Sequence, residues 1–284
     1  MANSEKDKSI SKMNTQRDPL VAICIPAYEK PEEMKRLLDS IILQSYKNYK
    51  VVITDDSRTN AVECQVKNYN NSKIIYHKNE KQIGPAGNSS YAIKCGLAEG
   101  ADLIKIMYSD DFFSAPNSLE KMVNVQVSTE AFAVFAADFE VTGERTIPRV
   151  PAEIDIGKVQ KDHSVLFLAN YLGAPSTILF RADPTEFDKN VTMLMDVDFY
   201  YRLLRGRNFV YIFEPLISIG HDGDQLSDFY NAHRDLVAKE FRYVMNKYPE
   251  LRTFPNYLYL LKYRTIDSLK VFVKSKLEKR QETK

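Results

Sequence analysis

The chain has few cysteines, almost no net charge and no long apolar run, and each of these shortages narrows what the protein can be. Its three cysteines, Cys24, Cys64 and Cys95, share no metal-type spacing, and an odd number does not make a disulfide framework. The 39 basic and 38 acidic residues leave a formal charge of +1, which gives no general attraction to nucleic acid. We therefore expect a protein of a reducing compartment without a nucleic-acid partner.

No apolar run approaches the length of a membrane span, and the N-terminus has no signal-peptide core. These absences predict a soluble, cytoplasmic protein, with peripheral contact to the inner face of a membrane left open. The 44% hydrophobic and 27% charged residues are ordinary for a globular chain. We expect a disordered polar tail at 1–18, one domain at 19–232 and a helical extension at 233–284.

Strand-like and helix-like segments alternate through the first half of the chain. The apolar runs that predict buried strands are 20–25, 50–54, 73–76 and 103–107. Helical patterns lie between or after them, beginning near Pro31, Gly84 and Leu119. Alternation of this kind predicts an α/β fold whose mostly parallel central sheet is flanked by helices on both faces.

The second half is less regular. Strands are expected at 131–137, 177–180 and 209–213, whereas 143–161 carries loop signals and no clear element. A helix is expected from Asp196 to Arg205, because the following Gly206 would end it.

Two adjacent carboxylates, Asp110 and Asp111, follow the apolar run 103–108. A buried strand would deliver them to its carboxyl end, which is the edge where open α/β sheets bind ligands. Like charges at close range disfavour joint ionisation, and a divalent cation removes that penalty. The alternative is a loop in which acids merely cap a strand.

The tips of the first two strands form a second candidate site. They read Ile25-Pro26-Ala27-Tyr28-Glu29 and Thr54-Asp55-Asp56-Ser57, and they should be neighbours in a right-handed α/β sheet. The carboxylate of Asp56 could accept the N3–H of a uracil, and Tyr28 could lie against the base. The competing interpretation is a helix-capping Asp and a packed Tyr.

Four segments together resemble glycosyltransferase family 2. They are IPAYEKPEEMKRLLDSIILQSY, VVITDDS, IGPAGN and YSDDFF, and the similarity extends over roughly residues 20 to 228. The resemblance implies an inverting, metal-dependent enzyme with the Rossmann-like GT-A fold, which uses a nucleotide sugar as donor. The expected cofactor is Mn²⁺ or Mg²⁺.

The resemblance also implies roles for individual residues on the donor side. Asp56 would recognise the base, Asp110 would face the ribose and Asp111 would bind the metal. The family often has a further Asp where this chain has Tyr108, and often an Arg after Asn88, for which Lys81 is a weak substitute. The expected nucleotide-binding residues are Pro26, Ala27, Tyr28, Glu29, Asp56, Gly84, Asn88, Ser109 and Asp110.

A later acidic segment resembles the family's catalytic base. Asp196 precedes Arg202 by six residues, as in the family pattern, and would take the proton from the acceptor hydroxyl. Asp198 is better interpreted as a solvated or Arg-paired acid. His221, in a Gly- and Asp-rich loop, would be the second metal ligand, with Asp222 as the fallback.

The predicted activity is transfer of a sugar, from UDP in preference to other nucleotides, to the hydroxyl of a glycan or lipid-linked acceptor. Such a reaction belongs to the synthesis of a bacterial surface polysaccharide or glycoconjugate. The alternatives are an inactive nucleotide-sugar or partner-binding module and, less favoured, a nucleotidyltransferase. The apolar and basic stretch 257–284 could pack on the domain, on a second subunit or on an anionic membrane.

Overall fold

The computed structural model describes residues 17–221, 234–253 and 256. Most of the expected disordered tail, the fallback ligand Asp222 and the apolar and basic stretch 257–284 lie outside the described residues. Within the described ranges, no helix is both long and apolar enough to cross a bilayer.

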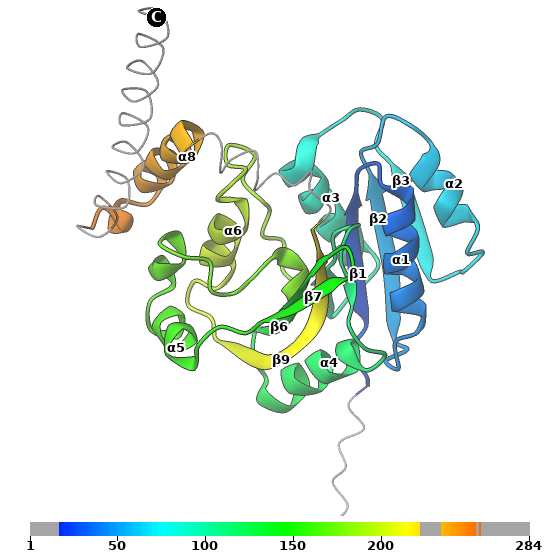
Figure 1. The fold of residues 1–284 in the computed structure, drawn as a ribbon, viewed down its shortest axis with the longest axis horizontal. Coiled ribbons are helices and arrows are strands. Elements are labelled where there is room, and N and C mark those ends of the chain that lie inside the picture. The colour runs from blue at the N-terminus through cyan, green and yellow to red at the C-terminus, as the bar shows by residue number, and fades with distance from the viewer. Residues whose placement is uncertain (1–16, 222–233, 254–255, 257–284) are drawn as a thin grey trace, which may run out of the picture.

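A single nine-stranded sheet forms the centre of the molecule, in the order β3-β2-β1-β4-β8-β6-β9-β5, with β7 paired to β6 (Figure 1). Strands β1, β2, β3, β4, β6 and β9 run in one direction, and β5, β7 and β8 run in the other, so the mostly parallel sheet is confirmed. The strands are β1 (Val21–Ala27), β2 (Tyr49–Asp55), β3 (Ile74–Lys78), β4 (Leu103–Ile106), β5 (Phe112–Phe113), β6 (Ala133–Thr142), β7 (Arg145–Arg149), β8 (Ile178–Arg181) and β9 (Phe209–Gly220).

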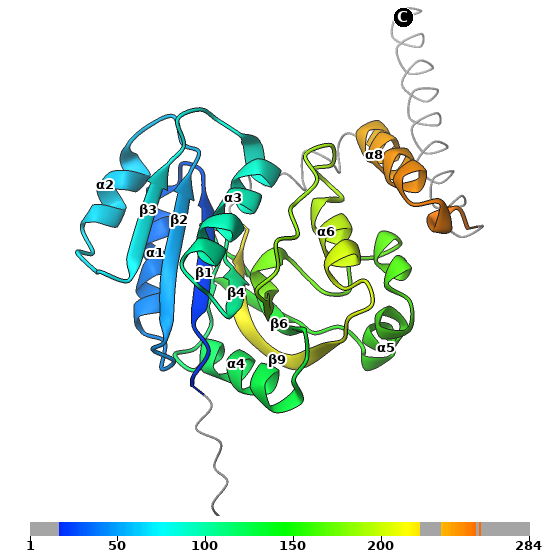
Figure 2. The ribbon, with the colours of Figure 1, turned by 180° about the vertical axis from the view of Figure 1, so that it is seen from behind.

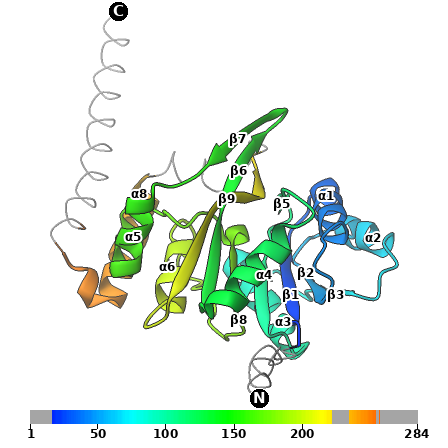
Figure 3. The same cartoon turned by 90° about the horizontal axis from the view of Figure 1, so that it is seen from below.

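Helices cover both faces of this sheet, as Figure 2 shows from behind and Figure 3 from below. The apolar side chains of α1, α2 and α4 share one core with one face, and those of α3, α6 and α8 share a second core with the other. The helices are α1 (Pro31–Ile42), α2 (Ala61–Lys67), α3 (Gly84–Ala98), α4 (Ser118–Thr129), α5 (Glu153–Lys161), α6 (Met195–Leu203) and α8 (Arg234–Lys247).

Strand β1 is buried on both faces because its side chains alternate between the two cores. Ile23 and Ile25 belong to the α1 core, whereas Ala22 and Cys24 belong to the α3 core. Helix α3 approaches β1 so closely that a Cβ on Gly96 would lie 2.7 Å from the Cys24 Sγ. Glycine at 96 therefore permits the packing of α3 against β1, and this fixes where α3 begins relative to the strand tips.

The expected absence of structure at 143–161 is wrong. Strand β7 forms a hairpin with β6, and α5 follows it. The signals are weak because Pro148 lies within the strand and Gly157 lies within the helix, and both residues lower the propensity of such elements. Pairing with β6 on one side only lets β7 accommodate Pro148.

Candidate active site

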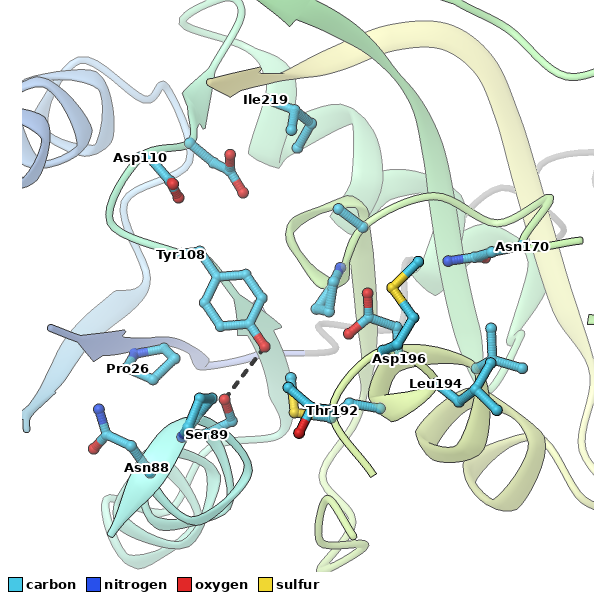
Figure 4. A pocket seen from close by; sticks show the side chains of 18 of the residues that line it. Pro26, Asn88, Ser89, Tyr108, Asp110, Asn170, Thr192, Leu194, Asp196 and Ile219 are labelled. Carbon is cyan, nitrogen blue, oxygen red and sulfur yellow. Dashed lines mark hydrogen bonds between the residues drawn. The ribbon is translucent and has the colours of Figure 1, made fainter. Parts of the chain in front are cut away.

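A cavity of about 800 Å³ opens at the carboxyl ends of β1, β2 and β4. One side is lined by the strand tips that carry Tyr28, Asp56 and Asp110, and the other by the segment 192–197 that begins α6. Figure 4 shows Asp110 on one side of the cavity and Asp196 on the other, with the ring of Tyr108 between them. The structure therefore places the two acidic motifs, which are far apart in the sequence, around one space.

Asp56 lies on the cavity wall and binds the start of α3. Its carboxylate accepts the backbone N–H groups of Ile83 at 2.9 Å and Gly84 at 2.9 Å, and the side-chain amide of Asn79 at 2.9 Å. A carboxylate suits this position because the first N–H groups of a helix lack intrahelical partners. A base N–H would have to share an oxygen that already accepts a hydrogen bond. Tyr28 is 47% exposed at the cavity, so its ring is not packed in the core.

Asn88 and Glu29 join the tips of the first two strands. The Asn88 amide donates to the carbonyls of Ala27 and Thr54, both at 3.0 Å. Glu29 accepts from the Arg58 N–H at 2.9 Å, so it binds the loop after β2. Glu29 and Lys30 adopt positive φ angles of 51° and 58°, which turn the chain sharply into α1.

The carboxylate pair lies at the tip of β4, and its two members differ in surroundings. Asp110 is partly exposed and forms an ion pair with Lys30 at 3.0 Å. Asp111 is buried and accepts the N–H of Gly220 at 3.2 Å. Burial, and then the charge of Asp110, raise the pKa of Asp111 to about 8.

The donor atoms at this tip fit a hard divalent cation. Two carboxylates face a cavity large enough for a nucleotide, and oxygen ligands completed by phosphates are what Mg²⁺ takes. The buried hydroxyl of Ser109 has no hydrogen-bond partner among the described residues, so it is available to a ligand. Within the described ranges, no three His, Cys, Asp or Glu side chains gather as a ready metal cage.

His221 follows Gly220, the residue whose N–H binds Asp111. Its own N–H donates to Val141, and its ring Nε2 lies 3.5 Å from Nη1 of Arg149. That guanidinium also binds the Asp138 carboxylate at 2.6 Å. The imidazole thus lies beside the base of the β6–β7 hairpin, and its metal role stays a prediction.

Asp196 lies in the first turn of α6, and its carboxylate points into the cavity toward Tyr108 (Figure 4). Burial raises the pKa of this carboxyl to about 7. A base with a pKa near the working pH accepts a proton and releases it again efficiently. The Tyr108 hydroxyl lies 3.3 Å from that of Ser89, which holds the ring across the cavity.

Asp198 has the structural role expected of it, since it is fully buried and paired with Arg202 at 2.7 Å. It also binds Lys247 of α8 at 3.0 Å and accepts the hydroxyl of Tyr248 at 2.7 Å. The two acids two residues apart on α6 are thus divided, one facing the cavity and the other anchoring α8.

Sequence reasoning missed several polar partners of the site. Lys105 is fully buried in β4, where burial lowers its pKa to about 7 and its charge favours ionised Asp111. Lys30 forms the ion pair with Asp110, and Asn79 donates a hydrogen bond to Asp56. Lys105 could have been noticed as the one charge in an apolar run, whereas the other two have no signal apart from their position next to a strand or helix end.

The model of the family "Glycosyl transferase family 2" matches residues 22–186. An uncharacterized glycosyltransferase of Rickettsia typhi is 25% identical over 236 residues, which cover 80% of this chain and 72% of that protein. The Escherichia coli enzyme WfaP, a UDP-Glc:α-D-GlcNAc-diphosphoundecaprenol β-1,3-glucosyltransferase, is 29% identical over 50% of this chain and 56% of its own.

Solved structures share the fold. TarS 1–349 of Staphylococcus aureus in complex with UDP superposes with a TM-score of 0.57 at 16% identity, over 78% of this chain and 65% of that one. The mannosyltransferase PcManGT of Pyrobaculum calidifontis, in complex with GDP-Man and Mn²⁺, gives a TM-score of 0.57 at 15% identity, over 88% and 70%. These likenesses confirm the expected GT-A fold. Because the family model covers more than half of the chain, the protein belongs to glycosyl transferase family 2.

Proposed function

We propose that the protein transfers a sugar from a nucleoside-diphosphate donor, with UDP favoured, to an acceptor hydroxyl with inversion of the anomeric configuration. The observation that carries the proposal is the single cavity with a carboxylate pair on one side and Asp196 on the other. The donor nucleotide would lie over the tips of β1, β2 and β4, and the acceptor would approach from the α6 side.

Asp196 is the proposed general base. Its carboxylate takes the proton from the acceptor hydroxyl, the acceptor oxygen forms a bond to the anomeric carbon, and the bond from that carbon to the diphosphate oxygen breaks. One displacement of this kind inverts the configuration. The cavity walls contribute by aligning the three reacting atoms.

Asp111 and His221 are the residues that would hold Mn²⁺ or Mg²⁺, whose charge would stabilise the departing diphosphate, and Asp110 beside them would face the ribose. The buried Asp111 carboxyl, with its raised pKa, is a group whose ionised form gains from a nearby cation. The same fold in PcManGT is seen with Mn²⁺, which supports this choice of ion.

The acceptor is proposed to be a lipid-linked sugar or glycan in the synthesis of a bacterial surface polysaccharide. The support comes from relatives: WfaP is named for an undecaprenol-diphosphate-linked acceptor, and the related WcaA of Escherichia coli is named for colanic acid biosynthesis. Such a lipid-linked acceptor implies work at a membrane surface.

The test is a screen of nucleotide sugars with Mn²⁺ and a short acceptor, with release of free nucleoside diphosphate as the readout. Donor-dependent release that needs the acceptor supports a transferase. Binding of donors without any release would favour the inactive binding module. Calorimetric titration with UDP and GDP tests which nucleobase is preferred, because Asp56 and Tyr28 should favour uracil. Tighter binding of GDP would overturn the uridine preference and leave the roles of the carboxylate pair and Asp196 untouched.

A further inference from the structure

The carboxylate of Glu240, on helix α8, binds the backbone that leads into the proposed catalytic helix. It accepts the N–H groups of Thr192 at 3.0 Å, Met193 at 2.9 Å and Leu194 at 3.1 Å. These three residues line the cavity and immediately precede Met195, where α6 begins. One side chain thus fixes three consecutive peptide groups of the cavity wall.

This contact resembles a helix cap at Leu194, the cap position of α6, but it comes from a distant segment and also binds the two residues before the helix. Leu194, at the cap position of α6, makes no capping hydrogen bond with its own side chain. Unpaired N–H groups at a helix start carry partial positive charge, and a carboxylate there is favourable. Hydrogen bonds to an ionised acceptor are also stronger than those between neutral groups.

Two further contacts hold α8 on either side of the same loop. Lys247 binds Asp188 at 2.6 Å, before the loop, and Asp198 at 3.0 Å, after it. The hydroxyl of Tyr243 donates to Asp188 at 2.9 Å. The segment 188–198 is therefore fixed to α8 at its beginning, at its centre and at its end.

We infer that Glu240 is a positioning residue for Asp196: by binding the backbone of residues 192–194, it sets the direction in which the first turn of α6 presents the base to the cavity. The inference rests on the proposed role of Asp196. It assigns α8, which lies beyond the range of the family model, to the catalytic apparatus.

The inference predicts a split between catalysis and donor binding. The hydrogen bonds that shape the donor side join β1, β2, β4 and the start of α3, such as those of Asp56 and Asn88. Loss of the Glu240 carboxylate should move the base and leave these contacts in place. A displacement of about 1 Å in a reacting group can cost about a hundredfold in rate.

The experiment compares Glu240→Ala, Glu240→Gln and the control Asp235→Asn in the full chain. Asp235 is on the same helix, and its carboxylate forms only an exposed pair with Lys239 at 3.7 Å among the interactions described. The readouts are kcat, donor Kd, thermal unfolding and amide hydrogen exchange at residues 192–194. For Glu240→Ala we expect faster exchange at these amides, kcat lowered by about tenfold to a hundredfold, and a donor Kd within about twofold of the parent.

Glu240→Gln keeps one acceptor oxygen, so it should restore part of the exchange protection and part of kcat, and Asp235→Asn should behave as the parent. Unchanged amide exchange in Glu240→Ala would overturn the inference that Glu240 holds residues 192–194. Faster exchange with an unchanged kcat would also overturn it. So would a fall in kcat accompanied by weaker donor binding and a lower unfolding temperature, because that pattern would mean a role in folding alone. If the parent transfers no sugar, the proposed function fails, while the exchange measurement still decides whether Glu240 holds the loop.

Discussion

The two sides of the cavity are held in different ways. On the donor side, most of the residues that bind one another lie on the tips of β1, β2 and β4 and at the start of α3, within the first 111 residues; Gly220, which binds Asp111, is an exception. On the α6 side, the loop before Asp196 is fixed by Glu240 and Lys247, from a helix more than 40 residues further along the chain. The donor side is therefore arranged mainly by the strand tips of the sheet, and the α6 side depends on contacts from α8, a helix outside the sheet.

This difference indicates which wall of the cavity can change position independently of the sheet. Strand tips in a parallel sheet must lie together, so the donor side is arranged once the sheet forms. Under the inferred role of Glu240, a change in α8 would move Asp196 without touching the proposed nucleotide site.

The largest expected effect is on the α6 side. Asp196→Asn should lower kcat by about two to four orders of magnitude, because the amide cannot accept the proton. Donor affinity should stay at the parent value, and stability at pH 8 should not fall, since burial makes the ionised carboxylate costly. Steady-state kinetics measure the loss of kcat, and calorimetric titration measures the donor affinity. Near-parent turnover would place the base elsewhere and remove the contrast between the sides.

The next largest effect concerns the anchor of α8. Asp198→Asn removes a fully buried carboxylate from Arg202 and Lys247, which are about a quarter exposed and can partly regain water. Breaking a buried pair costs about 3–5 kcal/mol, so we expect about 2 kcal/mol here after allowing for that exposure. Urea unfolding measures it, with the exposed Asp39→Asn as control at about 0.5 kcal/mol or less. Equal losses in the two variants would show that α8 is not anchored through Asp198.

On the donor side, Asp111→Asn should weaken nucleoside diphosphate binding in Mn²⁺ by about tenfold or more, equivalent to about 1.4 kcal/mol. The amide keeps an acceptor for the Gly220 N–H but loses the charge. Asp196→Asn is the matched control, because it changes an acid of the same cavity and should bind the nucleotide as the parent does. Parent-like affinity in the Asp111 variant would move the metal site away from the tip of β4.

The smallest effect is a change of pH. Because the pKa of Asp196 is raised to about 7, most of this carboxyl is protonated at pH 6, and kcat should fall by about tenfold between pH 8 and pH 6. In the folded state the group binds its proton more tightly than in the unfolded chain, so ionisation between about pH 4 and pH 7 lowers stability. A pH-independent kcat over this window would show that another group limits the reaction.

The sequence predicts the donor side well because its signals are local. Apolar runs locate β1, β2, β3 and β4, and acids at their ends locate Asp56, Asp110 and Asp111 at the cavity. Their individual partners could not be predicted, since the bonds of Asp56 to Ile83 and Gly84 depend on the path of a loop. The helix-capping interpretation of Asp56 accounts for these hydrogen bonds. The role of Asp56 in recognising the nucleobase stays a prediction.

The α6 side is predicted only in part. The resemblance to the family pattern points to Asp196 and Arg202, and the structure places Asp196 on the cavity wall in the first turn of α6, where its role as the base stays a prediction. Nothing in the sequence links Glu240 to residues 192–194, because a surface-type acid on an amphipathic helix has many possible partners. For the same reason, no pattern predicts that Arg149 lies beside the ring of His221.

The continuous sheet has a consequence for how ligands enter and leave the cavity. Strand β4 leads to the carboxylate pair, and it is hydrogen-bonded to β8, which pairs in turn with β6 and then β9. The strands beneath the donor wall thus belong to one hydrogen-bonded layer, and the facing wall, residues 192–197, lies in the loop and first turn of α6 outside that layer. The described sheet therefore has no break about which two lobes could swing apart. We expect donor binding and product release to depend on the loops at the rim, so turnover should be more sensitive to loop rigidity than to any motion of the sheet.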